Sequence, residues 1–77
     1  MEKFLDKFSI GEKGTVISVS ADGKIRRRLF DMGVTPGAEI TMRKVAPLGD
    51  PIEVTIRGYE LTLRKSEASA GKMEVAK

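Results

Sequence analysis

The sequence predicts a mainly β fold, a small antiparallel barrel of about five strands with one short α-helix inserted after the first long strand. Short runs of β-branched or alternating apolar residues are separated by Gly and Pro turn signals, which is typical of strands. A single segment has apolar residues at helical spacing instead. With 77 residues, the chain is expected to form one domain, residues 1–77. Closure of the sheet would hide edges that a free sheet of this size exposes.

The first strand is predicted over Thr15–Ser20, a β-branched run that follows the turn signal Gly11–Gly14. A second strand is predicted over Glu39–Val45. It follows Thr35–Ala38, where Pro then Gly at the centre specifies a type II turn. The segment Ala46–Pro51 is expected to be a loop, because its two prolines are incompatible with a central strand.

A helix is predicted over residues 23–32, between the first two strands. Asp22 is the expected N-cap, and Gly33 is the expected C′ residue in the left-handed conformation. Val34 is then expected to fold back on the last turn. The helix has one apolar stripe, formed by Ile25, Leu29 and Met32.

A β-hairpin is predicted from the alternating runs Ile52–Arg57 and Glu60–Arg64, joined by a two-residue type II′ turn at Gly58–Tyr59. After it, residues 65–71 are expected to form a turn or a helical turn, and Met73–Val75 a terminal strand. On the core side this register places Ile56 opposite Leu61 and Val54 opposite Leu63.

The composition excludes several classes of site. The chain has no Cys, no His and no Trp. It therefore has no disulfide, thiolate zinc site or iron–sulfur cluster, and it lacks the commonest general base. We expect no enzyme activity, no catalytic residue and no cofactor. Carboxylates such as Asp50 and Glu53 bind ferrous iron weakly without imidazole or thiolate, so no tight metal site is predicted.

The charge balance is mildly basic, with 14 Lys and Arg residues against 11 Asp and Glu residues and a net charge of +3. This excess does not require a nucleic-acid partner. The start of the chain does not have the pattern of a signal peptide, and no apolar run approaches the roughly 20 residues that span a bilayer. The expected location is the cytoplasm, with any membrane role supplied by a partner.

Four segments, in this order, resemble the ferrous iron transport protein A (FeoA) family: Gly14–Val16, Arg28–Gly37, Ala46–Pro51 and Leu61–Ala68. The second contains R-L-x-D-M-G-x-x-P-G, a specific motif. The resemblance extends from about Phe8 to Val75. The motif also occurs in the C-terminal SH3-like domains of some metal-dependent transcriptional repressors.

The resemblance implies an SH3-like barrel and a cytosolic accessory protein of bacterial ferrous iron uptake. The implied partner is the large membrane transporter of that system, which carries a cytosolic GTP-binding domain and would place the protein at the inner face of the membrane. The implied mechanism is protein–protein interaction without insertion into the bilayer.

The predicted partner-binding residues are Arg26, Arg27 and Phe30 on the helix, Leu48 in the proline-rich loop, and Tyr59. An exposed Phe is a typical interface hot spot, and loops on a rigid barrel often bind partners.

Three adjacent arginines spread over about 200° of helix, so they cannot all face one ligand. The other interpretation is therefore a solvated helix face on which Arg27 or Arg28 pairs with Asp31. Two alternative functions remain, a small nucleic-acid-binding module that uses Arg26, Arg27 and Arg28, and a transition-metal-binding module.

Overall fold

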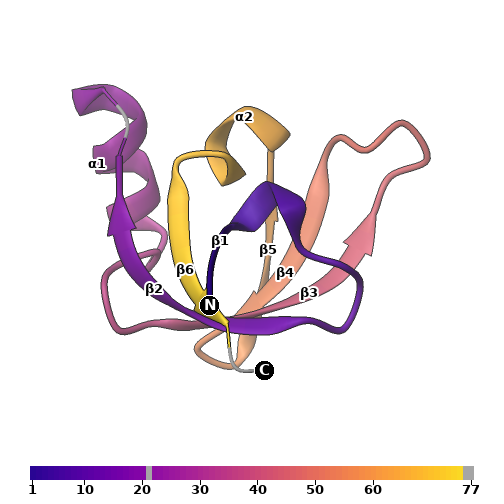
Figure 1. Ribbon diagram of the computed structural model, residues 1–77. Helices are drawn as coiled ribbons and strands as arrows, with labels where there is room; N and C mark the ends of the chain where they lie inside the picture. Colours follow the sequence, from indigo (N-terminus) through magenta and orange to yellow (C-terminus); the bar gives the residue numbers. More distant parts are fainter. Residues whose placement is uncertain (21, 76–77) are drawn as a thin grey trace.

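One curved antiparallel sheet dominates the computed structural model, which describes residues 1–20 and 22–75 (Figure 1). The order of its strands is β1-β6-β2-β3-β4-β5. A 3₁₀ helix, η1, follows β1, and two α-helices, α1 and α2, precede β3 and β6. The bounds are β1 Glu2–Phe4, η1 Leu5–Lys7, β2 Lys13–Val19, α1 Gly23–Asp31, β3 Glu39–Val45, β4 Ile52–Ile56, β5 Tyr59–Leu63, α2 Lys65–Ala68 and β6 Gly71–Val75.

The mainly β class and the position of the helix are confirmed, but the described residues form six strands and not five. The additional strand is β1, whose Lys3 lies opposite Met73 of β6. Its three residues, Glu2, Lys3 and Phe4, do not alternate charged with apolar side chains, and by themselves they do not distinguish a strand from a solvated terminus. These residues form a strand because β6 has an unpaired edge with which β1 can hydrogen-bond. The ladder leaves β1 and β5 as its edges, so the barrel is an open one.

The core lies on the concave side of the sheet and contains side chains from every strand except β1. Leu5 of η1 and Ala68 of α2 close one end. Strand β4 shows the predicted alternation, with its apolar residues buried and the residues between them half-buried. The fully buried large side chains are Leu5, Leu29, Val34, Ile40, Met42, Val54, Ile56, Leu63 and Met73.

Helix α1 begins and ends where the sequence predicts. The Asp22 carboxylate accepts a hydrogen bond of 3.2 Å from the Ile25 N–H, as an N-cap does. Gly33 has a φ of +93°, and the N–H of Val34 donates to the Leu29 carbonyl at 2.9 Å. This bond defines a Schellman motif, and Val34 is buried beneath the last turn.

The hairpin register is a correction to the sequence prediction. The two-residue turn is Arg57–Gly58, so Ile56 pairs with Tyr59 and Val54 pairs with Leu61. Both turn residues have positive φ angles, +50° and +85°, which is the type I′ geometry that matches the twist of the flanking strands. The predicted type II′ turn at Gly58–Tyr59 is therefore wrong, and Tyr59 belongs to β5.

The pattern of alternation could not detect this error, for a geometric reason. Moving the turn by one residue changes each cross-strand partner by two positions. Because side chains alternate with a period of two, apolar residues face apolar residues in both registers. Other predicted elements needed smaller adjustments: β2 starts at Lys13, and β6 starts at Gly71.

The type I′ turn predicts a specific sensitivity at Gly58. Gly58→Ala places a side chain at a positive φ and is expected to lower the free energy of unfolding by about 1–2 kcal/mol. The matched control is Gly23→Ala at the start of α1, where an added methyl meets no atom within 4 Å. That change is expected to be neutral or to stabilise by up to about 1 kcal/mol. Urea unfolding measures both, and equal losses would contradict the assigned turn.

Candidate partner-binding surface

Helix α1 presents a cationic outer surface. Four of the five residues from Lys24 to Arg28 are Lys or Arg, and all four are exposed. Leu29 is 1% exposed and orients the helix against the core. Since successive residues are about 100° apart, Arg27 lies nearly opposite Leu29 and points outward, with Asp31 one turn further along the same ridge.

Two shallow hollows flank this ridge, and Arg27 and Asp31 line both of them. The first is lined by Lys24, Arg27, Arg28, Asp31 and Met32. The second is lined by Gly23, Arg26, Arg27, Phe30 and Asp31. Met32 and Phe30 are half-buried and pack against the core, so each hollow has one apolar side chain among charged ones.

Phe30 is half-buried, so part of its side chain remains exposed while the rest packs against the core. The guanidinium carbon of Arg26 lies 5.0 Å from the centre of the Phe30 ring, within the range of a cation–π contact. Arg26, Arg27 and Phe30 are thus brought together on one surface.

The expected ion pair of Asp31 with Arg27 or Arg28 is not formed. Within residues 1–20 and 22–75, Asp31 has no cationic partner within 4.0 Å. Arg28 instead pairs with Glu67 of α2, with Nε 3.0 Å from the carboxylate. Glu67 is 7% exposed, and its other oxygen accepts the Arg64 N–H at 2.9 Å at the start of α2. The carboxylate of Glu67 is buried and held by a backbone hydrogen bond, whereas that of Asp31 is exposed, and sequence spacing could not reveal this partner.

Tyr59 adjoins the surface at the C-terminal end of α1. Its hydroxyl donates to the Met32 carbonyl, and Arg57 donates to the Thr35 hydroxyl at 3.1 Å. These contacts connect the β4–β5 hairpin to the end of the helix. Tyr59 remains 45% exposed, so its ring adds to the outer surface.

Leu48 lies apart from the other predicted residues. It is 95% exposed in the β3–β4 loop, which projects on the opposite side of the molecule from α1 (Figure 1). Two contacts brace the loop: the Gly49 N–H donates to the Ala46 carbonyl at 2.7 Å, and the Asp50 carboxylate accepts the Lys65 N–H at 2.9 Å. The loop therefore presents Leu48 on a constrained frame.

Sequence reasoning missed part of the α1 surface. Lys24 and Asp31 are one turn before and after Arg27, a spacing that would have identified them.

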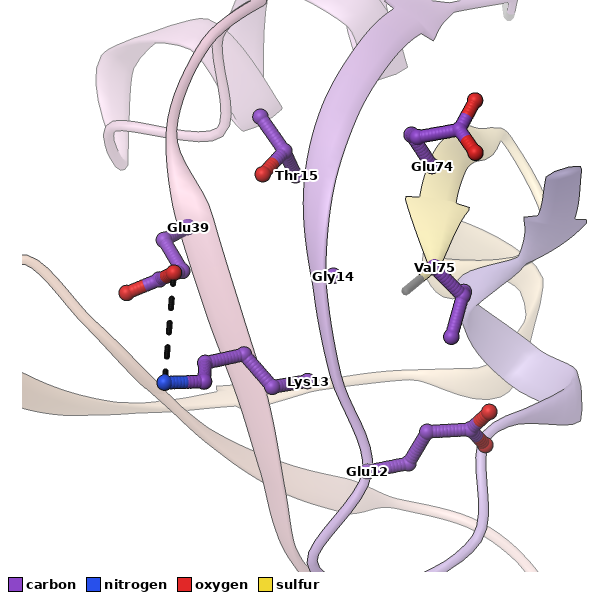
Figure 2. Close-up of a pocket in the computed structure, with 7 residues that line it drawn as sticks. All are labelled: Glu12, Lys13, Gly14, Thr15, Glu39, Glu74 and Val75. Carbon is purple, nitrogen blue, oxygen red and sulfur yellow. Dashed lines mark ion pairs between the residues drawn. The ribbon is translucent and has the colours of Figure 1, made fainter. Parts of the chain in front are cut away.

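Sequence reasoning also missed a hollow away from α1. This hollow, shown in Figure 2, lies between β2, β3 and β6 and is lined by Glu12, Lys13, Gly14, Thr15, Glu39, Glu74 and Val75. Each of its carboxylates has a cation: Lys3 for Glu12, Lys13 for Glu39 and the N-terminal ammonium for Glu74.

In the part of the chain that the structure describes, no three Asp or Glu side chains are grouped so that they could hold a metal ion. No helix among those residues has the length and apolar character needed to cross a bilayer.

The pKa of Glu12 is lowered by its contacts. The Lys3 ammonium donates to both carboxylate oxygens at 2.9 Å and lowers the pKa of Glu12 below its ordinary value of 4.5. The Ser9 N–H donates to the same carboxylate and acts in the same direction. This pair connects β1 to the start of β2, so it stabilises the fold at some distance from α1.

Comparison with known proteins identifies a family and a relative. The family model described as the FeoA domain matches residues 4–70. The chain is 31% identical over 71 residues to the Fe(2+) transport protein A/Fe(2+) transporter FeoB fusion protein of Porphyromonas gingivalis. That match covers 92% of this chain but 8% of the fusion protein.

Solved structures agree with the fold. A FeoA-like protein from Clostridium acetobutylicum is 42% identical, with a TM-score of 0.91 over 99% of this chain and 88% of that chain. A zinc complex of FeoA from Stenotrophomonas maltophilia is 29% identical, with a TM-score of 0.81 over 94% of this chain and 89% of that chain. It is described as a procaryotic SH3 domain protein, which confirms the predicted SH3-like class.

A manganese-dependent transcriptional repressor shares the fold alone. It is 22% identical, with a TM-score of 0.90 over 97% of this chain and 37% of that chain. This confirms the expected structural relation to domains of metal-dependent repressors.

The contact between α1 and α2 predicts unequal effects of its two partners. Glu67→Ala removes a buried helix cap and an ion pair and is expected to cost about 1–2 kcal/mol of unfolding free energy. Arg28→Gln removes the partner whose side chain is 64% exposed, so it is expected to cost less than about 1 kcal/mol. Chemical denaturation of both variants measures the difference. A larger loss in Arg28→Gln would show that the ion pair, and not the cap, is the main contribution.

The lowered pKa of Glu12 predicts a pH-dependent contribution to stability. The folded state binds the proton of Glu12 less readily than the unfolded state, so the contribution is present above pH 4.5 and is lost as the pH falls through the folded pKa. Glu12→Gln is therefore expected to lower the thermal midpoint near neutral pH and to converge with wild type on acidification. Lys3→Gln should lower it in the same way. A difference that persists unchanged in acid would refute this assignment.

Proposed function

Because this chain belongs to the FeoA domain family, we propose that it is a non-enzymatic accessory protein of bacterial ferrous iron uptake that binds the membrane ferrous iron transporter. One observation carries this proposal. In the Porphyromonas gingivalis relative, a domain similar to this chain is covalently joined to FeoB. Covalent linkage holds two modules at high effective concentration, which is useful when they act on each other.

The properties of the described side chains support binding and not catalysis. The chain has no His or Cys to act as base or nucleophile. The carboxylates around the hollow of Figure 2 are each paired with a cation, so none is positioned as an unpaired base. The hollows on α1 are shallow and lined by long charged side chains, a geometry that suits a protein surface.

We assign the principal contact to the outer face of α1, with Arg26, Arg27 and Phe30 at its centre and Tyr59 at its margin. Leu48 forms a second contact on the opposite side of the barrel. The chain then acts as a single domain that meets the partner at two separated points. Two hydrogen bonds constrain the β3–β4 loop, and the burial of Leu29 holds α1 against the core. Both reduce the conformational entropy lost on binding.

The proposed location is the cytoplasmic face of the membrane, where the transporter carries its GTP-binding domain. Attachment is through the partner and without insertion into the bilayer. In this position the protein can alter the nucleotide cycle or the assembly of the transporter. The Stenotrophomonas maltophilia relative has been suggested as a ferrous iron transport activating factor, and the present proposal is consistent with that role.

Calorimetric titration tests the proposal. The full chain is titrated into the cytosolic GTP-binding domain of its host's ferrous iron transporter, with GDP and with a GTP analogue, and into the full-length transporter in detergent. We expect saturable binding that weakens about tenfold or more in Phe30→Ala and in Leu48→Ala, because buried apolar anchors carry much of an interface's affinity.

Ile10→Ala is the matched control, since Ile10 is also apolar and 66% exposed but lies in the segment before β2. It is expected to bind as wild type does. Phe30→Ala could lower stability because Phe30 packs against the core. Leu48→Ala then still tests the proposal, because Leu48 is exposed and outside the core. Absence of binding in every nucleotide state, to the domain and to the full-length transporter, would overturn the proposal.

A further inference from the structure

The cationic side chains of α1 differ in the groups that they contact. Arg28 pairs with Glu67, and the guanidinium of Arg26 covers the Phe30 ring. Among residues 1–20 and 22–75, neither Lys24 nor Arg27 has an anionic partner within 4.0 Å. Positive charge therefore remains available on the outer ridge of the helix, which carries Arg27.

The surroundings of Arg27 are amphipathic. The hollow on one side contains Met32, and the hollow on the other side contains Phe30, with Arg27 common to both. Arg27 and Phe30 are about 60° apart around the helix and line one hollow, so a ligand there would place an anion beside the guanidinium and an apolar group against Phe30. An ionic contact beside an apolar one excludes water from the charge, which strengthens the electrostatic attraction.

We propose that the α1 surface binds an acidic, amphipathic segment of a protein, in which a carboxylate contacts Arg27 and an apolar side chain contacts Phe30. This inference rests on the proposed function and specifies the chemistry of the partner's contact segment. It follows from charge complementarity to a ridge that has Arg27 exposed at its centre.

The negative charge of Asp31 favours binding of a peptide over binding of a polyanion at this surface. It lines both hollows one turn from Arg27, so any ligand that covers the surface comes close to its carboxylate. A nucleic acid or an anionic membrane carries negative charge at every position and would be repelled there. A peptide can place a carboxylate at Arg27 and a neutral or basic side chain at Asp31.

The opposite charges at positions 27 and 31 provide the test. Arg27→Gln is expected to weaken binding to the transporter's cytosolic domain about three- to tenfold, and Asp31→Asn to strengthen it about two- to fivefold. Lys7→Gln in η1 removes the same charge elsewhere and is expected to have no effect. The affinity of wild type is also expected to fall between roughly 0.05 M and 0.5 M salt.

A second set of probes separates this inference from the proposed function. The same variants are titrated with a synthetic peptide of alternating Glu and Leu, a single-stranded oligonucleotide, and vesicles containing phosphatidylserine. Binding of the peptide with the expected order of variants, without binding of the transporter, would uphold the acidic-segment inference and reject the proposed partner.

Transporter binding that does not change in Arg27→Gln and Asp31→Asn would overturn the inference and leave the proposed function intact. Preferential binding of the oligonucleotide or the vesicles would also overturn it, because the surface would then recognise phosphate. Binding of none of the probes, the transporter included, would overturn both.

Discussion

The burial of Leu29 is the contact on which the arrangement of α1 depends. It is the one buried residue of the helix, and its burial against the core leaves Arg27 on the opposite side. Two further contacts hold the helix at its sides: Arg28 pairs with Glu67 of α2, and the Tyr59 hydroxyl donates to the Met32 carbonyl. Because a short helix has little stability of its own, these tertiary contacts maintain the outer surface in one orientation.

The distribution of ion pairs makes α1 different from the rest of the surface. Around the hollow of Figure 2, carboxylates and cations neutralise one another. On α1 the cations exceed the anions, and Arg27 is left exposed between two partly apolar hollows. A small net charge for the whole chain thus coexists with a strongly cationic helix. A partner would recognise this local distribution of charge, since charges farther away are screened by salt.

The elements that sequence predicted well are those whose determinants are local. Helix α1 has an N-cap at Asp22 and a left-handed Gly33, and both act on the nearest turn of backbone. The hairpin register was wrong because two turn positions preserve the same alternation, and the type I′ geometry at Arg57–Gly58 decided between them. β1 was missed because its pairing partner, β6, lies at the other end of the chain.

The sequence alone determined the mainly β class, the single inserted helix, the lack of Cys and His chemistry, and the group Arg26, Arg27 and Phe30. Phe30 is four residues from Arg26 and three from Arg27, and residues at these spacings lie on one side of a helix. The tertiary structure decided which of these side chains remain exposed and free to contact a partner. It paired Arg28 with the distant Glu67, left Asp31 beside Arg27 and placed Leu48 across the barrel. These outcomes depend on how separate strands and helices pack, and sequence spacing carries no information about contacts between segments so far apart in the chain.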